Sequence, residues 1–391
     1  MLSKVFRSSL SDSRLLGVIA PSVLVFVVGS LVIGRAVVER RDAWLLGDWL
    51  IDYSAGFSRR GLIGEGIRQV AGFLGIDRIM LTATLIWVVF TAVLFVVTAL
   101  FLHQYRGYTT VLLLVSPAFL FFFLNFLGTM RKELLLFLLV GVVLLVTKLT
   151  RQGAWGWLLA GLFPVLVFAH EGLALYGLFV LIVVFLLYSE GLLTKKHAIW
   201  QGSVTTALTA LTGWGLSRRG DSAGIDQQIC DNLIDEGYSK RLCGGAIAFL
   251  DRTPEEAIAR VAGLVVSDNY LTTYALVVAL AAIPFIFVRL SKTLLVLFAT
   301  AAFLTVPLFM VAIDWGRWIV ISVWLITLVA VRFDRSPHIQ VRPIHPKTLT
   351  SDLLLIAAVM SYAMLWSVPH CCEPRIGFGI IDRLEDLVRL L

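Results

Sequence analysis

Long apolar runs, separated by short connectors rich in charged residues, constrain this chain more than any other feature. A helix needs about 20 apolar residues to cross the hydrocarbon core of a bilayer, where every backbone polar group must be hydrogen-bonded internally. Of the 391 residues, 59% are hydrophobic and only 15% are charged, whereas a soluble domain carries about 25% charged residues. The pattern predicts an all-α, polytopic integral membrane protein.

We predict about eleven transmembrane helices. The first apolar run is followed by charged residues and not by a small-residue cleavage site, so we interpret it as a retained helix. No Gly/Ser-rich or Pro-rich linker interrupts the chain, which predicts a single membrane domain over residues 1–391. The predicted spans cover residues 15–38, 79–103, 109–128, 133–149, 154–170, 172–189, 200–216, 269–288, 293–313, 316–332 and 352–368.

Two longer segments fall between or after these spans. The first, residues 217–268, is predicted to be a folded extracytoplasmic insertion, because Thr253-Pro254-Glu255-Glu256 is typical of a helix start. The second, residues 369–391, is predicted to be an extracytoplasmic amphipathic tail. The amphipathic pattern of residues 61–74 predicts a further surface helix. Simple solvated connectors are the alternative for all three.

Charge sets the predicted orientation. With the N-terminus in the cytoplasm of the plasma (inner) membrane, the short inside connectors are mostly basic, as the positive-inside rule requires. All four cysteines then lie outside, where Cys230 and Cys243 can close a disulfide. Cys371 and Cys372 remain open between pairing and free or modified thiols. The net charge of +7 is distributed over connectors and does not indicate a nucleic-acid partner.

Five charged clusters fall on the same predicted face, although several of their basic residues run against the positive-inside rule. Charges within or against a spanning segment cost free energy unless they are paired or hydrated, so each is a candidate functional site. The clusters are Asp48 to Asp52 with Arg59-Arg60, Arg131-Lys132-Glu133, His170-Glu171, Arg218-Arg219-Gly220-Asp221, and Asp314 with Arg317.

These clusters support two interpretations. In the first, acid–base pairs join helix ends and have no chemical role. In the second, they meet in one pocket, where arginine forks bind phosphate oxygens and a carboxylate acts as general base or holds a divalent ion. Those are the requirements of an enzyme that moves a sugar from a lipid phosphate to an acceptor hydroxyl.

His170 has two interpretations of its own. A lone histidine at the end of an apolar run is usually a packing residue, but one followed by Glu171 is a candidate base or ligand. The zinc motif H-E-x-x-H is absent, because position 174 is Ala. The sequence also contains no phosphate-binding P-loop and no G-x-S-x-G elbow, which gives ATP-driven transport and serine-hydrolase chemistry no support.

The arrangement resembles the GT-C class of integral-membrane glycosyltransferases. In that class a catalytic Asp lies in the first outside loop, which implies Asp48 or Asp52, here spaced D-x-x-x-D instead of D-x-D. A second acidic site between the third and fourth helices implies Glu133. The resemblance also implies a polyprenyl-phosphate sugar donor. Its phosphate would be bound by Arg59, Arg60, Arg131, Lys132 and Arg317.

The chain is also similar to O-antigen (Wzy-type) polymerases, which match it in length and carry functional arginines in outside loops. They move a whole repeat unit where a GT-C enzyme moves one sugar. A lipid or glycan transporter or flippase is a third possibility, although such proteins tend to have midplane sites and internal repeats. We find no clear repeat.

The function we predict is an extracytoplasmic glycosyltransferase of cell-envelope polysaccharide or glycolipid assembly. Its partners would be a polyprenyl-phosphate-linked sugar or glycan, an acceptor glycan or lipid, and membrane lipids. The predicted supporting residue is Asp314, and Asp52 and Glu133 are candidates to hold Mg²⁺ or Mn²⁺. The predicted catalytic residues are Asp48, Asp52, Glu133, His170 and Glu171.

Overall fold

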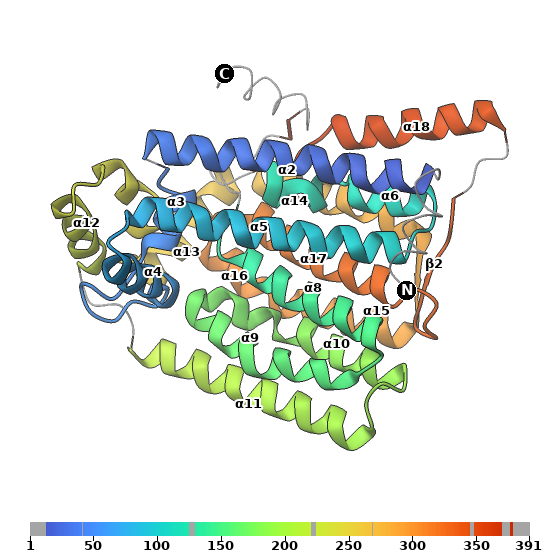
Figure 1. The fold of residues 1–391 in the computed structure, drawn as a ribbon, viewed down its shortest axis with the longest axis horizontal. Coiled ribbons are helices and arrows are strands. Elements are labelled where there is room, and N and C mark those ends of the chain that lie inside the picture. Colours follow the sequence, from blue (N-terminus) through green and yellow to red (C-terminus); the bar gives the residue numbers. More distant parts are fainter. Residues whose placement is uncertain are drawn as a thin grey trace.

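The chain folds into a bundle of roughly aligned helices with a minimal two-stranded sheet (Figure 1). The computed structural model describes residues 13–40, 42–124, 130–219, 224–267, 269–344, 348–369 and 376–377. Within these residues the only strands are β1 (Val288–Leu290) and β2 (Ile339–Val341), which pair antiparallel. The all-α fold class is therefore confirmed.

The helices fall into long segments that run along the bundle and short ones that lie at its ends. Short 3₁₀ helices (η) interrupt several connectors. The helices are α2 (Ser13–Glu39), α3 (Leu45–Leu50), α4 (Gly61–Leu74), α5 (Arg78–His103), α6 (Tyr108–Leu114), α7 (Pro117–Leu124), α8 (Glu133–Thr150), η1 (Gly153–Gly156), α9 (Trp157–Ala169), η2 (Glu171–Tyr176), α10 (Gly177–Ser189), α11 (Lys195–Arg219), α12 (Ile225–Asp235), η3 (Lys240–Gly244), η4 (Ile247–Phe249), α13 (Pro254–Ser267), α14 (Tyr270–Ala282), η5 (Ile283–Phe287), α15 (Lys292–Leu304), α16 (Val306–Val311), α17 (Trp315–Arg332) and α18 (Leu349–Met364).

The predicted number of about eleven spans is too high. Seven helical segments among the described residues are long and apolar enough to cross a membrane. They correspond to the predictions at 15–38, 79–103, 133–149, 172–189, 269–288, 293–313 and 316–332, and their bounds are Gly17–Glu39, Arg78–His103, Glu133–Thr150, Glu171–Ser189, Tyr270–Phe287, Lys292–Val311 and Trp315–Arg332.

The other four predicted spans differ for physical reasons. Within the predicted span 109–128 the described residues form two short helices, α6 and α7, because Pro117 begins a new helix after Ser116. The apolar helices Gly153–Ala169 and Thr350–Met364 are shorter than a bilayer-spanning helix. The fourth, α11, is long enough, but its threonines, glycines and terminal charges make it less apolar than the seven.

One helix, α17, forms the centre of the bundle. Most of its residues are buried, including an arginine at each end. Trp324 in its middle stacks on Phe119 of α7 and Phe137 of α8, with ring centroids 4.1 and 4.4 Å apart, and its indole donates to the Phe119 carbonyl. Because α17 contacts α5, α7, α8 and α14, the position of its first turn is fixed from several sides.

The short helices α3, α4 and α12 gather at one end of the bundle, and β2 lies at the opposite end (Figure 1). The predicted amphipathic helix over residues 61–74 is present as α4, which ends at Gly75 in a left-handed conformation. Asp77 then caps α5 by accepting from the Met80 amide. We call the end with α3, α4 and α12 the capped end.

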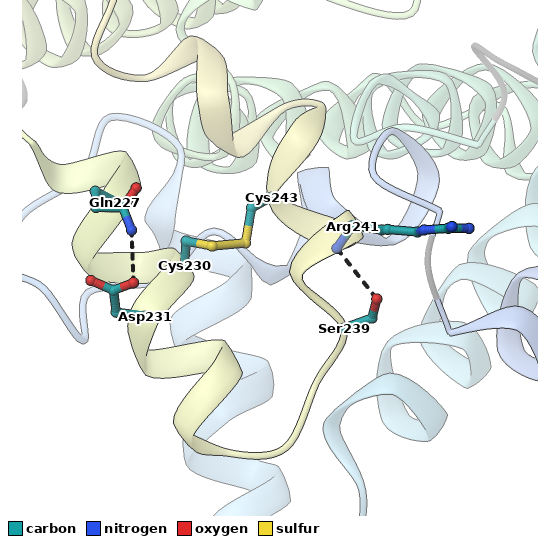
Figure 2. Close-up of a disulfide and its surroundings, with 6 residues drawn as sticks. All are labelled: Gln227, Cys230, Asp231, Ser239, Arg241 and Cys243. Atoms are coloured by element: carbon teal, nitrogen blue, oxygen red, sulfur yellow. Dashed lines mark hydrogen bonds between the residues drawn. A yellow bond between two sulfur atoms is a disulfide. The ribbon is translucent and has the colours of Figure 1, made fainter.

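The insertion at 217–268 contributes α12, η3, η4 and α13 to the capped end. A disulfide joins Cys230 of α12 to Cys243 of η3 (Figure 2). Its helix α13 begins at Pro254, as the sequence predicts, and Thr253 and Glu256 bond each other's backbone amides in a capping box. The predicted tail helix over 378–391 and the pair Cys371 and Cys372 lie outside the described residues.

The insertion packs closely on the first connector. The Ala246 amide donates to the Ala43 carbonyl at 3.2 Å. A Cβ added at Gly47 would lie 2.8 Å from the Leu242 carbonyl oxygen, and one added at Gly245 would lie 2.3 Å from the Ala43 oxygen. Glycine is therefore required where these two backbones meet.

Candidate functional site

Four segments that are distant in the sequence meet at a cavity of about 270 Å³, whose lining includes residues beside α4 and residues of the insertion at the capped end. They are the start of α4, the connector before α8, the break between α9 and η2, and the start of α17. A fifth segment, from the insertion, completes the wall. The charged residues that line the cavity are Arg59, Arg60, Arg131, Glu171, Arg252, Arg260, Asp314 and Arg317, beside His170, Trp44 and Trp318.

Helix ends position these side chains. The chain leaves the helical conformation at His170, whose φ and ψ are −159° and 105°, and resumes as η2 at Glu171. Glu133 occupies the first turn of α8, where the helix dipole favours a negative charge. Asp314 precedes the first residue of α17, and Arg317 lies in its first turn. The apolar spans thus bring their polar ends to one place.

Each arginine of the inner wall faces a carboxylate. Arg60 forks onto Glu171 with N–O distances of 2.7 to 3.1 Å. Arg317 contacts Glu133 through Nη1 at 3.2 Å and Asp314 through Nε at 3.1 Å. Arg131 approaches Asp314 at 3.4 Å and lies over the Trp44 ring at 4.9 Å. The two acids Glu133 and Asp314 are thereby bridged by one guanidinium.

His170 lines the cavity with Glu133 behind it. Its Nε2 lies 3.5 Å from the Glu133 Oε1, and the Trp318 ring meets it edge-on at 5.8 Å. Neither ring nitrogen has a hydrogen-bond partner among the described residues, although the side chain is 1% exposed. Burial, followed by the charge of Arg60, lowers the pKa of His170 to about 4. The imidazole is therefore neutral at pH 7 and able to accept a proton.

Asp48 and Lys132 form a layer behind the cavity wall. Both side chains are fully buried, and neither lines the cavity. The Lys132 amide approaches Asp48 Oδ2 at 3.5 Å, and Lys132 Nζ donates to the Arg60 carbonyl at 2.7 Å. Burial works against the charged form of Asp48, but Lys132 and Arg131 outweigh it and lower its pKa. Burial lowers the pKa of Lys132 to about 8.

Asp52 lies apart from the cavity. Its Oδ2 accepts from Arg78 Nη2 at 2.6 Å, and Oδ1 accepts from the Ser54 amide at 2.9 Å. Arg78 also bonds Glu236 at the end of α12. This arrangement joins the first connector, α5 and the insertion. Of the two candidate aspartates, Asp48 borders the cavity wall and Asp52 does not.

The other predicted residues divide in the same way. Arg59 lines the cavity and donates to the Leu250 carbonyl at 3.3 Å. Arg218 does not line it and lies over its neighbour Trp214 at 5.3 Å. The side chain of Arg219 and residue Asp221 are outside what the structure describes.

Two lining arginines, Arg252 and Arg260, are absent from the sequence-based prediction. Arg252 precedes α13 and Arg260 lies within it, and their guanidinium carbons lie 4.4 and 5.6 Å from the Phe249 ring centroid. The predicted helix start at Thr253 is the one sequence signal near them.

The carboxylates proposed to hold a metal are both paired with guanidinium groups, Asp52 with Arg78 and Glu133 with Arg317. Among the residues described by the structure, no group of three or more His, Cys, Asp or Glu side chains is placed to hold a metal ion.

Arginine forks, two pocket carboxylates and a buried neutral imidazole together can bind an anion and accept a proton. Comparison of the chain with protein-family models, curated proteins and solved structures finds no match.

Proposed function

We propose that this protein is a membrane glycosyltransferase that takes a sugar from a polyprenyl-phosphate carrier at the extracytoplasmic side. The observation that carries the proposal is the cavity itself. It combines six arginines with a buried histidine–glutamate pair and lies beside segments apolar enough to span a bilayer. Arginines can bind the phosphate, a histidine–glutamate pair can deprotonate the acceptor hydroxyl, and the apolar segments can adjoin the lipid chain.

In the proposed reaction His170 accepts the proton of the acceptor hydroxyl. The acceptor oxygen then bonds to the anomeric carbon while the bond from that carbon to the phosphate oxygen breaks. Glu133 stabilises the imidazolium that forms, as the carboxylate of a histidine–carboxylate pair does. The arginines of the wall balance the charge of the departing phosphate, which can be worth several kcal/mol in a site shielded from water.

A purely structural role fits the inner wall less well. Charges of both signs are desolvated there, and a buried ion pair is weak evidence for stability because desolvation offsets most of its Coulomb attraction. Among the residues that the structure describes, the imidazole of His170 has no hydrogen-bond partner, and the Nη1 and Nε atoms of Arg317 have none despite its ion pairs. Ordinary structural networks satisfy their buried polar atoms. Unsatisfied groups of this kind, beside a cavity, favour a ligand-binding role.

The test is transfer by the purified full chain in detergent or nanodiscs. Radiolabelled polyprenyl-phosphate sugars and an acceptor extract are supplied, and label is followed into acceptor. The expected result is transfer by the native protein and its loss in His170→Gln, while His197→Gln, at an exposed histidine outside the cavity, keeps the native rate. Transfer at the native rate by a folded His170→Gln protein would refute the assignment of the base.

Product length separates this proposal from its closest alternative. A glycosyltransferase adds one sugar, whereas an O-antigen type polymerase moves a repeat unit and yields a ladder. Movement of labelled lipid across a vesicle membrane without transfer would instead support a flippase.

A further inference from the structure

Charge is distributed unevenly between the inner wall and the mouth of the cavity. In the inner layer the cations Arg60, Arg131, Lys132 and Arg317 face an equal number of carboxylates, Asp48, Glu133, Glu171 and Asp314. That layer is neutral while His170 is unprotonated. An anionic ligand that binds there must compete with carboxylates already bonded to the same guanidinium groups.

The mouth, which we define by the half-buried Arg252 and the exposed Arg260, is different. Arg252 and Arg260 form no ion pair within the part of the chain that the structure describes. Both guanidinium groups instead make cation–π contacts with the Phe249 ring. Glu256 of α13 accepts a hydrogen bond from the Thr253 amide in the capping box. Two forks at the cavity mouth therefore have donors available for an anion.

The wall beside these arginines is apolar. Leu308 and Val311 of α16 and Ala257 of α13 line the cavity, and α13 packs against α16. The outer faces of the same two helices expose Ile258, at 43%, and Met310, at 54%. Because α16 belongs to a segment apolar enough to span the membrane, the mouth borders directly on the region where a lipid chain would lie.

We infer that Arg252 and Arg260 bind the phosphate of a long-chain polyprenyl phosphate, whose hydrocarbon chain lies along the exposed apolar faces of α13 and α16. The inference rests on the proposed function and assigns its lipid carrier to this site. The inner arginines then act on the phosphate only as it leaves. A free phosphate would use the two arginines but gain nothing from the apolar faces, so the combination favours a lipid-borne ligand.

The test is binding, measured on the full chain in nanodiscs by microscale thermophoresis with three probes. They are a long-chain polyprenyl phosphate, the polyprenol of the same length, and inorganic phosphate. The native protein is expected to prefer polyprenyl phosphate over both others by at least about tenfold, because hydrogen bonds to charged groups and apolar burial each contribute that much.

The variant is Arg252→Gln with Arg260→Gln, expected to weaken polyprenyl phosphate binding by at least about tenfold. The matched control is Arg241→Gln, an exposed arginine of the same insertion that does not line the cavity, and it should bind as the native protein does. An unchanged thermal midpoint shows that the variant is folded. If the folded double variant kept native affinity, the inference would be wrong.

Equal affinity of the native protein for inorganic phosphate and polyprenyl phosphate would also overturn it, in favour of a free-anion site. The outcomes are separable from those of the proposed function. Arginine-dependent binding without sugar transfer would reject the enzyme and keep the site. Transfer that is insensitive to the double variant, with native affinity, would keep the enzyme and reject the site.

Discussion

Arg78 and Asp52 form a buried ion pair, with Nη2 and Oδ2 2.6 Å apart and both side chains at most 6% exposed. Asp52→Asn leaves the Arg78 guanidinium with Glu236 as its remaining carboxylate. We expect a loss of about 3 kcal/mol in the free energy of unfolding, since removing one partner of a buried pair leaves a desolvated charge. Thermal and denaturant unfolding of the purified protein measure it.

The same variant should keep its transfer rate per folded molecule, because Asp52 does not line the cavity. A suitable comparison is Arg35→Gln, which removes an exposed i,i+4 pair with Glu39 and should change stability by about 0.5 kcal/mol or less. A stable Asp52→Asn protein without activity would return Asp52 to the list of catalytic candidates.

Arg317→Lys tests whether activity requires the Arg317 guanidinium group, which contacts both Glu133 and Asp314. One ammonium group cannot replace Nη1 on Glu133 and Nε on Asp314 together. We expect transfer to fall by about 100-fold, the effect of losing one aligned donor in a reaction site. Initial rates of sugar transfer give the measurement.

Arg289→Lys is the control for this change, since Arg289 is exposed on β1 and does not line the cavity. It should retain the native rate. Full activity of Arg317→Lys would mean that charge alone suffices at this position.

Stability should depend on pH through His170. Its pKa is about 4 in the folded chain against an ordinary value of 6.5. Between these pH values the unfolded chain binds a proton that the folded chain does not, so the free energy of unfolding rises as pH increases from about 4 to 6.5. The difference is roughly 3 kcal/mol, and thermal midpoints recorded across this range detect it.

His170→Gln should flatten that slope, whereas the exposed His197→Gln should preserve it. The rate of sugar transfer should depend on the same protonation of His170. It should decline as pH falls toward 4, where the proposed base becomes protonated. Identical slopes in the native protein and His170→Gln would contradict the buried, neutral state of the imidazole.

The close backbone contact between the insertion and the first connector can be tested at two neighbouring glycines. Gly245→Ala places a Cβ 2.3 Å from the Ala43 oxygen, whereas Gly244→Ala meets nothing within 4 Å. We expect the first to destabilise the protein by about 2 kcal/mol and to raise hydrogen exchange in residues 240–252. The second should match the native protein, and equal behaviour of the two variants would mean that the backbones need not touch.

Part of this arrangement follows from sequence, because charged residues mark where apolar segments end. His170 and Arg317 each adjoin an apolar segment, and segments that end on the same side bring their polar ends together. The choice between Asp48 and Asp52 does not follow, because it depends on Arg78 and Glu236 reaching one of them. Neither pairing leaves a local pattern.

Arg252 and Arg260 were missed for a related reason. Their position at the cavity depends on how the insertion packs over the first connector, through contacts such as Ala246 with Ala43. The number of spans was overestimated because apolar runs such as 109–128 contain helix breaks that hydropathy does not register. Buried helices inside a membrane protein are as apolar as spanning ones.

The cavity is lined both by Arg59 and Arg60 and by Arg317 and Trp318 of α17. During synthesis Arg59 and Arg60 are therefore made while more than half of the polypeptide, including α17, is still to be translated. Until Glu171 has been made, the charge of Arg60 lacks its ion-pair partner and stays hydrated. The site can consequently be completed only after α17 has been made, and a chain truncated before α17 would lack Arg317 and Trp318.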